Sequence, residues 1–263
     1  MAAQIKTILI LGATSGISEA FAQRLHGLGK KVIITGRRQN KIEEIKQKLP
    51  GVEGYVMDNT KINEIPSHVE KLFSQYPDID TVWINGGIQR HGNITKLQAN
   101  ADQEALDEIS VNLTGPIILA QHIIPRLLKK GTEANFMVTS SGIAFVPIPL
   151  CPIYGATKAG MYHYLVGLRQ QLQGTKVNIL ELVPPYVATD LVFHDSHPAL
   201  AALTPMPLEE YTRQSLELLE KSNASELKEL TVEAAGKAAG SAPRVAVWRN
   251  GPGKISEAMP FGG

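Results

Sequence analysis

The sequence predicts an α/β fold in which a doubly wound parallel sheet carries helices on both faces. Short apolar runs bounded by turn residues alternate along the chain with longer segments whose apolar residues recur every three or four positions. Apolar runs of this kind are typical of strands buried on both faces. No internal repeat, low-complexity tract or glycine–serine linker divides the 263 residues. Strands separated by helices imply parallel pairing through right-handed crossovers, so we expect a single domain spanning 1–263.

Six apolar runs are expected to form buried strands, at 7–11, 31–35, 54–57, 81–84, 135–139 and 177–183. We expect a seventh strand either at 227–232 or at 245–248, and the first is favoured. The segments with helical periodicity lie at 17–28, 42–49, 65–76, 98–112, 116–129, 154–173 and 208–219.

The segment 190–207 follows no clean period and holds three prolines and two histidines. We expect it to form a mobile loop over a ligand site. Together with the helix that follows, it gives a predicted substrate-covering loop and helix at 190–222.

Composition excludes several classes of protein. The 26 basic and 25 acidic side chains nearly cancel, which removes the electrostatic footprint of a nucleic-acid binder. Cys151 is the only cysteine, so no intramolecular disulfide forms, no cysteine-rich metal site can be built, and we expect no metal. The first eleven residues lack the apolar segment of a signal peptide, and no run of about 18 apolar residues occurs. We therefore expect a cytoplasmic protein that spans no membrane.

Two glycines stand at the first strand-to-helix turn and point to a nucleotide. There the backbone must turn tightly and approach a pyrophosphate without an intervening Cβ, while the helix N-terminus favours an anion. Turn glycines are common in proteins that bind no nucleotide, so this feature alone is weak. The candidate cofactor-binding residues of the turn are Gly12, Ser15, Gly16 and Ile17.

The end of the second predicted strand favours NADP over NAD. An NAD site has a carboxylate about 20 residues past the glycine loop, whereas this chain has Gly36 followed by Arg37 and Arg38. A guanidinium makes charge-assisted bidentate hydrogen bonds to a 2′-phosphate. Arg37 is the first choice, and Arg38 either stacks over adenine or faces water. The alternative is that both arginines belong to a solvated loop.

Tyr154 and Lys158 stand four residues apart at the head of a predicted helix, so their side chains share one face. A tyrosine with its ordinary pKa near ~10 exchanges protons poorly at neutral pH, and a nearby cation stabilises the phenolate. Tyr154 is therefore a candidate general acid and base. Ser141 follows the strand at 135–139, and its hydroxyl can donate to a carbonyl oxygen.

Taken together, these residues resemble the short-chain dehydrogenase/reductase family over about 7–190. Ser141, Tyr154 and Lys158 match the catalytic set of that family at its usual spacing. Asn112 matches the helix asparagine that holds a water in the family's proton relay. The resemblance implies a Rossmann fold, a nicotinamide cofactor and oxidoreductase activity.

The resemblance also implies further cofactor contacts. Asp58 matches the acid that contacts adenine, and Asn85 with Gly86 matches the asparagine–glycine strand end of the family. Val187 and Thr189 match the positions whose backbone and hydroxyl hold the nicotinamide carboxamide.

Two positions depart from the family pattern. Ser18 replaces the third loop glycine, and Pro184, a further expected cofactor contact, is followed by Pro185 where the family has glycine. The segment 181–191 is similar to the branch that contains the D-alanine-esterification operon dehydrogenases.

We therefore expect an NADP-dependent oxidoreductase that reversibly reduces a ketone or aldehyde to an alcohol. A candidate apolar binding surface favours a hydrophobic carbonyl substrate and consists of Phe145, Val146, Tyr186, Leu191, Val192 and Phe193. The helices at 116–129 and 154–173 have apolar outer positions, and their counterparts in the family pack between subunits. This predicts a homodimer or homotetramer.

Two alternative functions remain on the same fold. One is a non-catalytic cofactor-sensing or scaffold protein, which has no need of Ser141, Tyr154 and Lys158. The other is an epimerase or dehydratase of nucleotide sugars, whose relatives usually have a larger substrate domain than the stretch after Thr189 provides.

Overall fold

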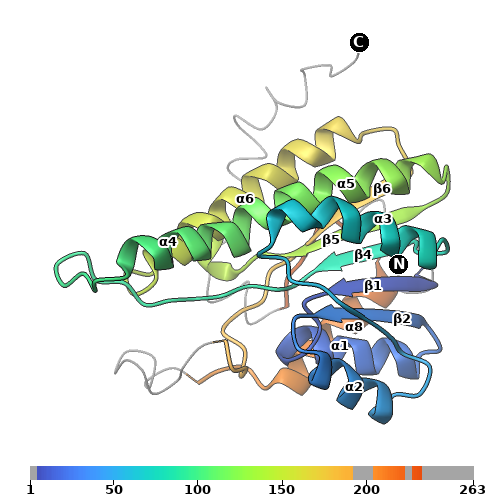
Figure 1. Cartoon of the computed structure of the whole chain (residues 1–263), viewed down its shortest axis with the longest axis horizontal. Coiled ribbons are helices and arrows are strands. Elements are labelled where there is room, and N and C mark those ends of the chain that lie inside the picture. The colour runs from blue at the N-terminus through green and yellow to red at the C-terminus, as the bar shows by residue number, and fades with distance from the viewer. Residues whose placement is uncertain (1–4, 192–203, 223–226, 233–263) are drawn as a thin grey trace.

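A seven-stranded parallel sheet organises the chain in the computed structural model, which describes residues 5–191, 204–222 and 227–232 (Figure 1). Each strand pairs in parallel with its neighbours, in the order β3-β2-β1-β4-β5-β6-β7. The winding direction reverses between β1 and β4, and in such sheets ligands bind at the carboxyl ends of the strands beside that point. The strands are β1 (Thr7–Leu11), β2 (Lys31–Gly36), β3 (Glu53–Val56), β4 (Thr81–Ile84), β5 (Ala134–Thr139), β6 (Val177–Leu182) and β7 (Glu229–Leu230).

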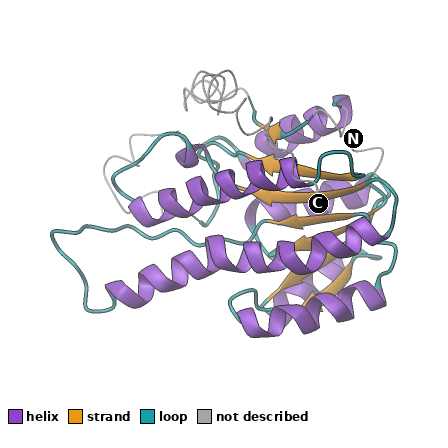
Figure 2. Cartoon of the chain, turned by 90° about the horizontal axis from the view of Figure 1, so that it is seen from above, coloured by secondary structure: helices purple, strands orange, loops and turns teal. Residues whose placement is uncertain are grey.

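Helices cover both faces of this sheet, as Figures 1 and 2 show. One face carries α1 (Gly16–Gly27), α2 (Gln39–Lys48) and α8 (Leu208–Lys221). The other carries α3 (Ile65–Gln75), α5 (Gly115–Lys129) and α6 (Pro152–Gln171). Before α5, α4 (Ala101–Ile109) projects beyond the carboxyl edge of the sheet. The doubly wound fold that the alternating pattern predicts is therefore confirmed.

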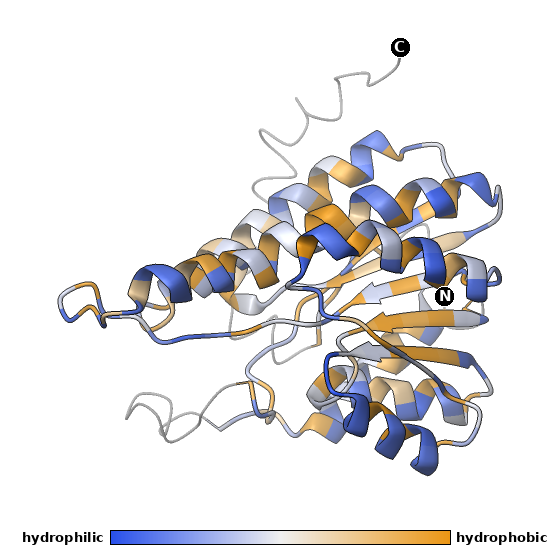
Figure 3. Ribbon diagram, in the orientation of Figure 1, coloured by the Kyte–Doolittle hydropathy of each residue, from blue (hydrophilic) through white to orange (hydrophobic). Residues whose placement is uncertain are grey.

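The two faces of the sheet bury separate hydrophobic clusters because side chains alternate along each strand. On β1, Ile8 and Ile10 belong to the cluster beneath α1 and α8, whereas Leu9 and Leu11 belong to the cluster beneath α3 and α5. Each such side chain stabilises the fold by about 1.5–3 kcal/mol when fully buried. In Figure 3 the strands are mostly apolar and the outward sides of the helices polar, as this burial requires.

One strand is less buried than the sequence indicates. We expected the run at 54–57 to be covered on both faces, but in β3 Glu53 and Val56 are exposed. The physical reason is its place in the sheet, because β3 is an edge strand that pairs only with β2. Its apolar composition alone did not distinguish an edge strand from a central one.

The two helices expected at 98–112 and 116–129 are one continuous rod with an irregular turn inside it. A π-helical turn, Ser110–Thr114, joins α4 to α5 without a break, and the Gly115 amide donates to the Ser110 carbonyl five residues earlier. Pro116 supplies the physical reason. It has no N–H, and its ring crowds the carbonyl four residues before it, that of Asn112.

The C-terminal part of the described chain rejoins the sheet. β7 pairs with β6, which confirms the seventh strand within 227–232, while the alternative at 245–248 lies outside the described residues. Val187 forms a β-bridge with Met206, and α8 packs beside α1 with Tyr211 in the core. Most of the expected loop, 192–203, lies outside the described residues. A substrate-covering role for 190–222 stays a prediction.

Candidate active site

Two cavities meet at the carboxyl edge of the sheet, where the winding reverses. The first, which we name the Arg37 cavity, has a volume of about 270 Å³ and lies around the ends of β2 and β3. The second, the Tyr154 cavity, has a volume of about 280 Å³ and extends between α1, α6 and the end of β6. The walls shared by both come from two short strand-end segments and consist of Gly12, Ser15, Gly86 and Gly87.

The glycine loop forms the ridge between the cavities because two backbones approach closely there. Gly12 has a φ of +81°, and a Cβ built on it would lie 2.7 Å from Gly86 Cα. Only glycine satisfies both conditions. The hydroxyl of the buried Ser18 donates to the Gly12 carbonyl over 2.7 Å, so this departure from the family pattern fits between helix and strand with its polar atom satisfied. Ser15 precedes α1 and makes no side-chain capping bond, which leaves its hydroxyl toward the cavities.

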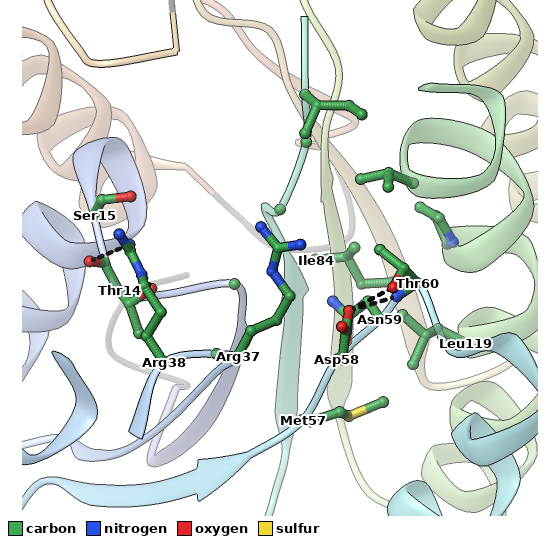
Figure 4. Close-up of a pocket in the computed structure, with 17 residues that line it drawn as sticks. Thr14, Ser15, Arg37, Arg38, Met57, Asp58, Asn59, Thr60, Ile84 and Leu119 are labelled. Atoms are coloured by element: carbon green, nitrogen blue, oxygen red, sulfur yellow. Dashed lines mark hydrogen bonds between the residues drawn. The ribbon is translucent and has the colours of Figure 1, made fainter. Parts of the chain in front are cut away.

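The two arginines of the Arg37 cavity have different surroundings (Figure 4). Arg38 donates to the Thr14 hydroxyl over 3.2 Å and to the Thr14 carbonyl over 3.4 Å. The guanidinium of Arg37 extends into the middle of the cavity and forms no hydrogen bond or salt bridge with any residue that the structure describes. Across the cavity, an Asp58 carboxylate oxygen accepts bonds from the amide and hydroxyl of Thr60.

The catalytic candidates on α6 are held at the wall of the Tyr154 cavity. Tyr154 and Lys158 are both buried, and Lys158 Nζ donates to the Thr139 carbonyl over 2.9 Å. The ammonium lies 5.4 Å from the centre of the Tyr154 ring. The Thr139 hydroxyl donates to Asn85 Oδ1 and accepts from Trp83 Nε1. The end of β5 therefore orients the lysine through a network that runs into the core.

Burial and hydrogen bonds shift the protonation of this pair. Burial raises the pKa of Tyr154 above its ordinary value, and the Ser141 hydroxyl, by hydrogen bonding to the phenol, acts in the opposite direction. Burial lowers the pKa of Lys158 to about 8, and the negative charge of Glu181 opposes this. Lys158 is therefore still mostly an ammonium at neutral pH. The expected lowering of the tyrosine's pKa by the lysine remains a prediction.

Asn112 lies on the π-helical turn and fixes the segment that follows β4. Its buried side chain accepts from the Ile88 amide over 2.9 Å and donates to the Ile88 carbonyl over 2.7 Å. A Cβ built on Gly87 would lie 3.2 Å from Asn112 Oδ1 and 3.7 Å from Lys158 Nζ. The absence of a side chain at Gly87 thus lets the asparagine and the lysine approach the same strand end.

One helical turn before Asn112, the buried carboxylate of Glu108 also binds the segment that follows β4. Glu108 Oε1 accepts from the Arg90 amide over 3.2 Å, and burial raises the pKa of Glu108. Further along, the Gly92 amide donates to the Leu150 carbonyl, so the segment after β4 lies beside the loop that precedes Tyr154. Glu108 and Asn112, spaced i and i+4, together hold this segment against one face of the rod.

The structure brings most of the sequence-predicted site residues to the two cavities. Apart from the shared walls, the Arg37 cavity is lined by the predicted Arg37, Arg38 and Asp58, and the Tyr154 cavity by Gly16, Ile17, Asn85, Tyr154, Lys158, Pro184 and Thr189. Three predicted residues line neither cavity, namely Ser141, Asn112 and Val187. The first two lie behind the walls, where they contact Tyr154 and the segment after β4.

Sequence reasoning missed Thr14, Asn59 and Glu108. Thr14 and Asn59 line the Arg37 cavity, and Glu108 fixes the segment after β4. Glu108 had a usable signal, since it is an acid four residues before Asn112 on the same helix face. Thr14 and Asn59 had no such signal in the sequence, because their importance depends on which strand ends lie side by side in the sheet.

Cys151 directly precedes α6. The thiol is buried, and burial raises its pKa, which favours an inert residue.

In the described part of the chain, no three histidine, cysteine or acidic side chains gather into a metal-binding group. None of the described helices has the length and apolarity needed to cross a bilayer.

Comparisons with known proteins agree with this geometry. The model of the family "short chain dehydrogenase" matches residues 6–198. An uncharacterized oxidoreductase of Bacillus subtilis, DltE, is 35% identical over 185 residues, which are 70% of this chain and 73% of that protein. A serine 3-dehydrogenase of Agrobacterium fabrum is 33% identical over 190 residues, again 70% of this chain and 73% of that protein.

Solved structures share the fold. A short-chain dehydrogenase from Sphingobium yanoikuyae in complex with NADPH superposes with a TM-score of 0.76 at 22% identity, over 98% of both chains. Likeness at this identity concerns the fold, so a preference between NADP and NAD has to be inferred from the residues of the cavity. The match to the family model and to DltE shows that this chain belongs to the short-chain dehydrogenases and is an oxidoreductase of that family.

Proposed function

We propose that this protein is an NADP-dependent oxidoreductase that reversibly reduces a ketone or aldehyde to an alcohol. The observation that carries the proposal is the meeting of the glycine loop and the pair Tyr154 and Lys158 around one cavity. A scaffold or cofactor sensor would need the loop alone. The buried, hydrogen-bonded pair adds the means to move a proton.

The residues present fit a nicotinamide dinucleotide phosphate. At Gly12 the loop passes so close to Gly86 that any Cβ would clash with that backbone, and α1 begins at Gly16, where its N-terminal amides favour the pyrophosphate. Arg37 supplies for the 2′-phosphate a guanidinium that no described residue binds, and Asp58 lies across the same cavity for the adenine. When bound, the nicotinamide supplies the hydride.

The chain's own residues handle the proton and the charge. Tyr154 donates its phenolic proton to the carbonyl oxygen during reduction and accepts a proton from the alcohol during oxidation. Ser141 donates a hydrogen bond to the same oxygen, which stabilises the charge that develops there. The Lys158 ammonium favours the phenolate and binds the ribose. Asn112 supports the proton relay, and Pro116, which lacks an N–H, leaves the Asn112 carbonyl without its usual helical donor.

One residue of the expected apolar surface, Leu191, lines the Tyr154 cavity and supports a hydrophobic carbonyl substrate. Phe145 lies outside the lining of that cavity and packs edge-on against Tyr162 at a centroid distance of 4.8 Å. Val192 and Phe193, which were expected to join them, lie outside the described residues. A panel of hydrophobic ketones and aldehydes, with L-serine as the polar comparison suggested by the Agrobacterium relative, would identify the class.

The experiment that tests the cofactor choice titrates NADPH and NADH against wild type and Arg37→Ala. A charge-assisted hydrogen bond contributes roughly 1.5–3 kcal/mol, which corresponds to a preference for NADPH of about 10- to 100-fold. We expect Arg37→Ala to lose most of this preference and salt to narrow it. Equal wild-type affinities, or a variant that keeps its preference, would contradict the proposal. NADPH binding without turnover of any carbonyl would favour the cofactor sensor instead.

We also propose a homodimer or homotetramer. Leu106 and Ile109 on α4 and Leu128 on α5 are large apolar side chains exposed in the single chain. Light scattering at micromolar concentration measures the mass, and we expect at least twice that of the 28.5 kDa chain. A mass equal to that of one chain would refute this assembly.

A further inference from the structure

Position 36 at the end of β2 lies against the side chain of Thr14. A Cβ built on Gly36 would lie 2.4 Å from Thr14 Cγ2 and 3.1 Å from Thr14 Oγ1. Real Cβ atoms do not approach a methyl group so closely, so glycine is the only residue that fits while Thr14 keeps its place. Gly36 needs no unusual backbone angle, because its φ is not positive. The constraint is therefore one of space alone.

Three contacts hold Thr14 in that place. The Ala13 amide donates to the Thr35 carbonyl over 2.8 Å, which ties the glycine loop to the residue just before Gly36. The Gly12 amide lies 3.4 Å from the Thr35 hydroxyl. Arg38 donates to the Thr14 hydroxyl, so rotating the side chain to move its methyl away would break that bond. The side chain is short and branched, and it has no flexible end that could turn aside.

We propose that Thr14 is a specificity-determining residue, which restricts position 36 to glycine and thereby bars a carboxylate from the ribose end of the Arg37 cavity. An acid at the end of the second strand is what an NAD site uses to accept bonds from the ribose hydroxyls. The Thr14 methyl excludes it by volume, and the Thr14 hydroxyl at the same time binds Arg38. This inference rests on the proposed NADP-linked function and adds the residue that enforces it.

A double-mutant cycle on the cofactor-free protein tests the steric part. Gly36→Ala places only a Cβ against Thr14, and we expect it to lower the melting temperature by at least ~3 °C, as overpacking does. In the Thr14→Ala background the nearest remaining atom is Thr14 Cβ at 3.4 Å, an ordinary contact, so Gly36→Ala should then change little. Thr14→Val is the matched control. It keeps a methyl group over position 36 and replaces the hydroxyl with a second methyl group, so Gly36→Ala should still destabilise it.

Cofactor titration tests the selectivity part. Gly36→Asp alone should weaken NADPH binding without strengthening NADH binding, because the carboxylate cannot take its place beside Thr14. Thr14→Ala with Gly36→Asp should bind NADH about 10-fold more tightly than wild type does. Equal NADH affinity in the single and double variants would overturn the inference, as would additive melting temperatures. Wild-type protein that binds both cofactors equally would refute the NADP proposal alone, because the melting cycle involves no cofactor.

Discussion

The Arg37 cavity differs from the other side of the Tyr154 cavity, where we propose that the substrate binds, in the length of the segments that form it. We call that other side the substrate side. The Arg37 cavity lies on strand ends and on short turns, chiefly 12–15 and 36–38, whose backbones are tied to one another. The substrate side adjoins the long connections 85–100 and 140–151 and the described residues 183–191 after β6. The first of these is held by a side chain from a distant element, because the Arg90 amide donates to Glu108 on α4.

This difference in segment length predicts how readily the two regions accept substitutions. Short turns between buried strands leave little conformational freedom, so a nucleotide end of this kind tolerates few substitutions. Long connections over a fixed sheet can vary in sequence while the scaffold stays the same. We therefore expect changes on the substrate side to alter KM for the carbonyl with little effect on the affinity for NADPH.

The largest effect is expected at Tyr154, which lines the Tyr154 cavity together with the glycine loop. Tyr154→Phe removes the phenolic proton and should lower kcat by at least ~10² while the dissociation constant of NADPH stays within threefold. Tyr164→Phe is the matched control on the same helix and should keep normal turnover. Steady-state rates and cofactor fluorescence measure both quantities. Near-normal kcat in Tyr154→Phe would remove the assignment of the general acid.

A smaller effect would test whether the substrate side is independent. Glu108→Ala leaves the Arg90 amide without its acceptor and should destabilise the fold by about 1–3 kcal/mol, measured by urea unfolding. It should also raise KM for the carbonyl substrate severalfold, because the segment after β4 adjoins the loop before Tyr154. Glu108→Gln keeps an acceptor oxygen and should behave like wild type. If Glu108→Ala weakened NADPH binding as much as substrate binding, the separation of the two regions would fail.

Local patterns predicted several residues that line the Arg37 cavity, and long-range contacts explain those that were missed. The strand–glycine–helix pattern around Gly12 and the pair Gly36–Arg37 are contiguous in sequence, so their chemistry could be inferred from the order of residues. The closeness of Thr14 to Gly36 depends on how the loop crosses the end of β2. The edge position of β3, and hence the exposure of Val56, likewise depends on strand order.

The π-helical turn is an intermediate case. Pro116 was visible in the sequence, and a proline is a usual cause of helix irregularity. The sequence pattern predicts a new helix that starts at Pro116, whereas the rod continues through it with Asn112 on the wide turn. Sequence periodicity did not distinguish the two because both leave the apolar positions of α5 unchanged.

The smallest expected effect concerns pH. The pKa of Lys158 is about 8, so kcat/KM for the cofactor, which reports the free enzyme, should fall as pH rises through that value. Glu181 is faced by Arg169 at 3.6 Å, by the Ser140 hydroxyl and by Glu229, its register partner on β7, and burial raises its pKa to about 7. It is therefore charged where it supports the lysine. Glu181→Gln should move the alkaline limb to lower pH, and Glu229→Gln should leave it in place.

The raised pKa of Glu181 also predicts how the free energy of unfolding depends on pH. Because its folded pKa lies above the ordinary value of 4.5, the native state binds the proton more tightly than the unfolded state does. The stabilisation that the native state gains from binding this proton is complete below pH 4.5 and is lost as pH rises through about 7. The stability of Glu181→Gln relative to wild type should therefore increase over this window and level off above it. A difference independent of pH would show that the carboxyl titrates normally.

The contact between Thr14 and Gly36 also has a consequence for the history of such a chain. If an acid at position 36 is tolerated only after the threonine methyl is gone, the two substitutions have one accessible order. A descendant that adopts NAD must first pass through a small residue at position 14, an intermediate that still uses NADP. The reverse path from an NAD-using ancestor must lose the acid before the threonine can arise. Chains with both an acid at 36 and a threonine at 14 should be rare among relatives that keep this loop geometry.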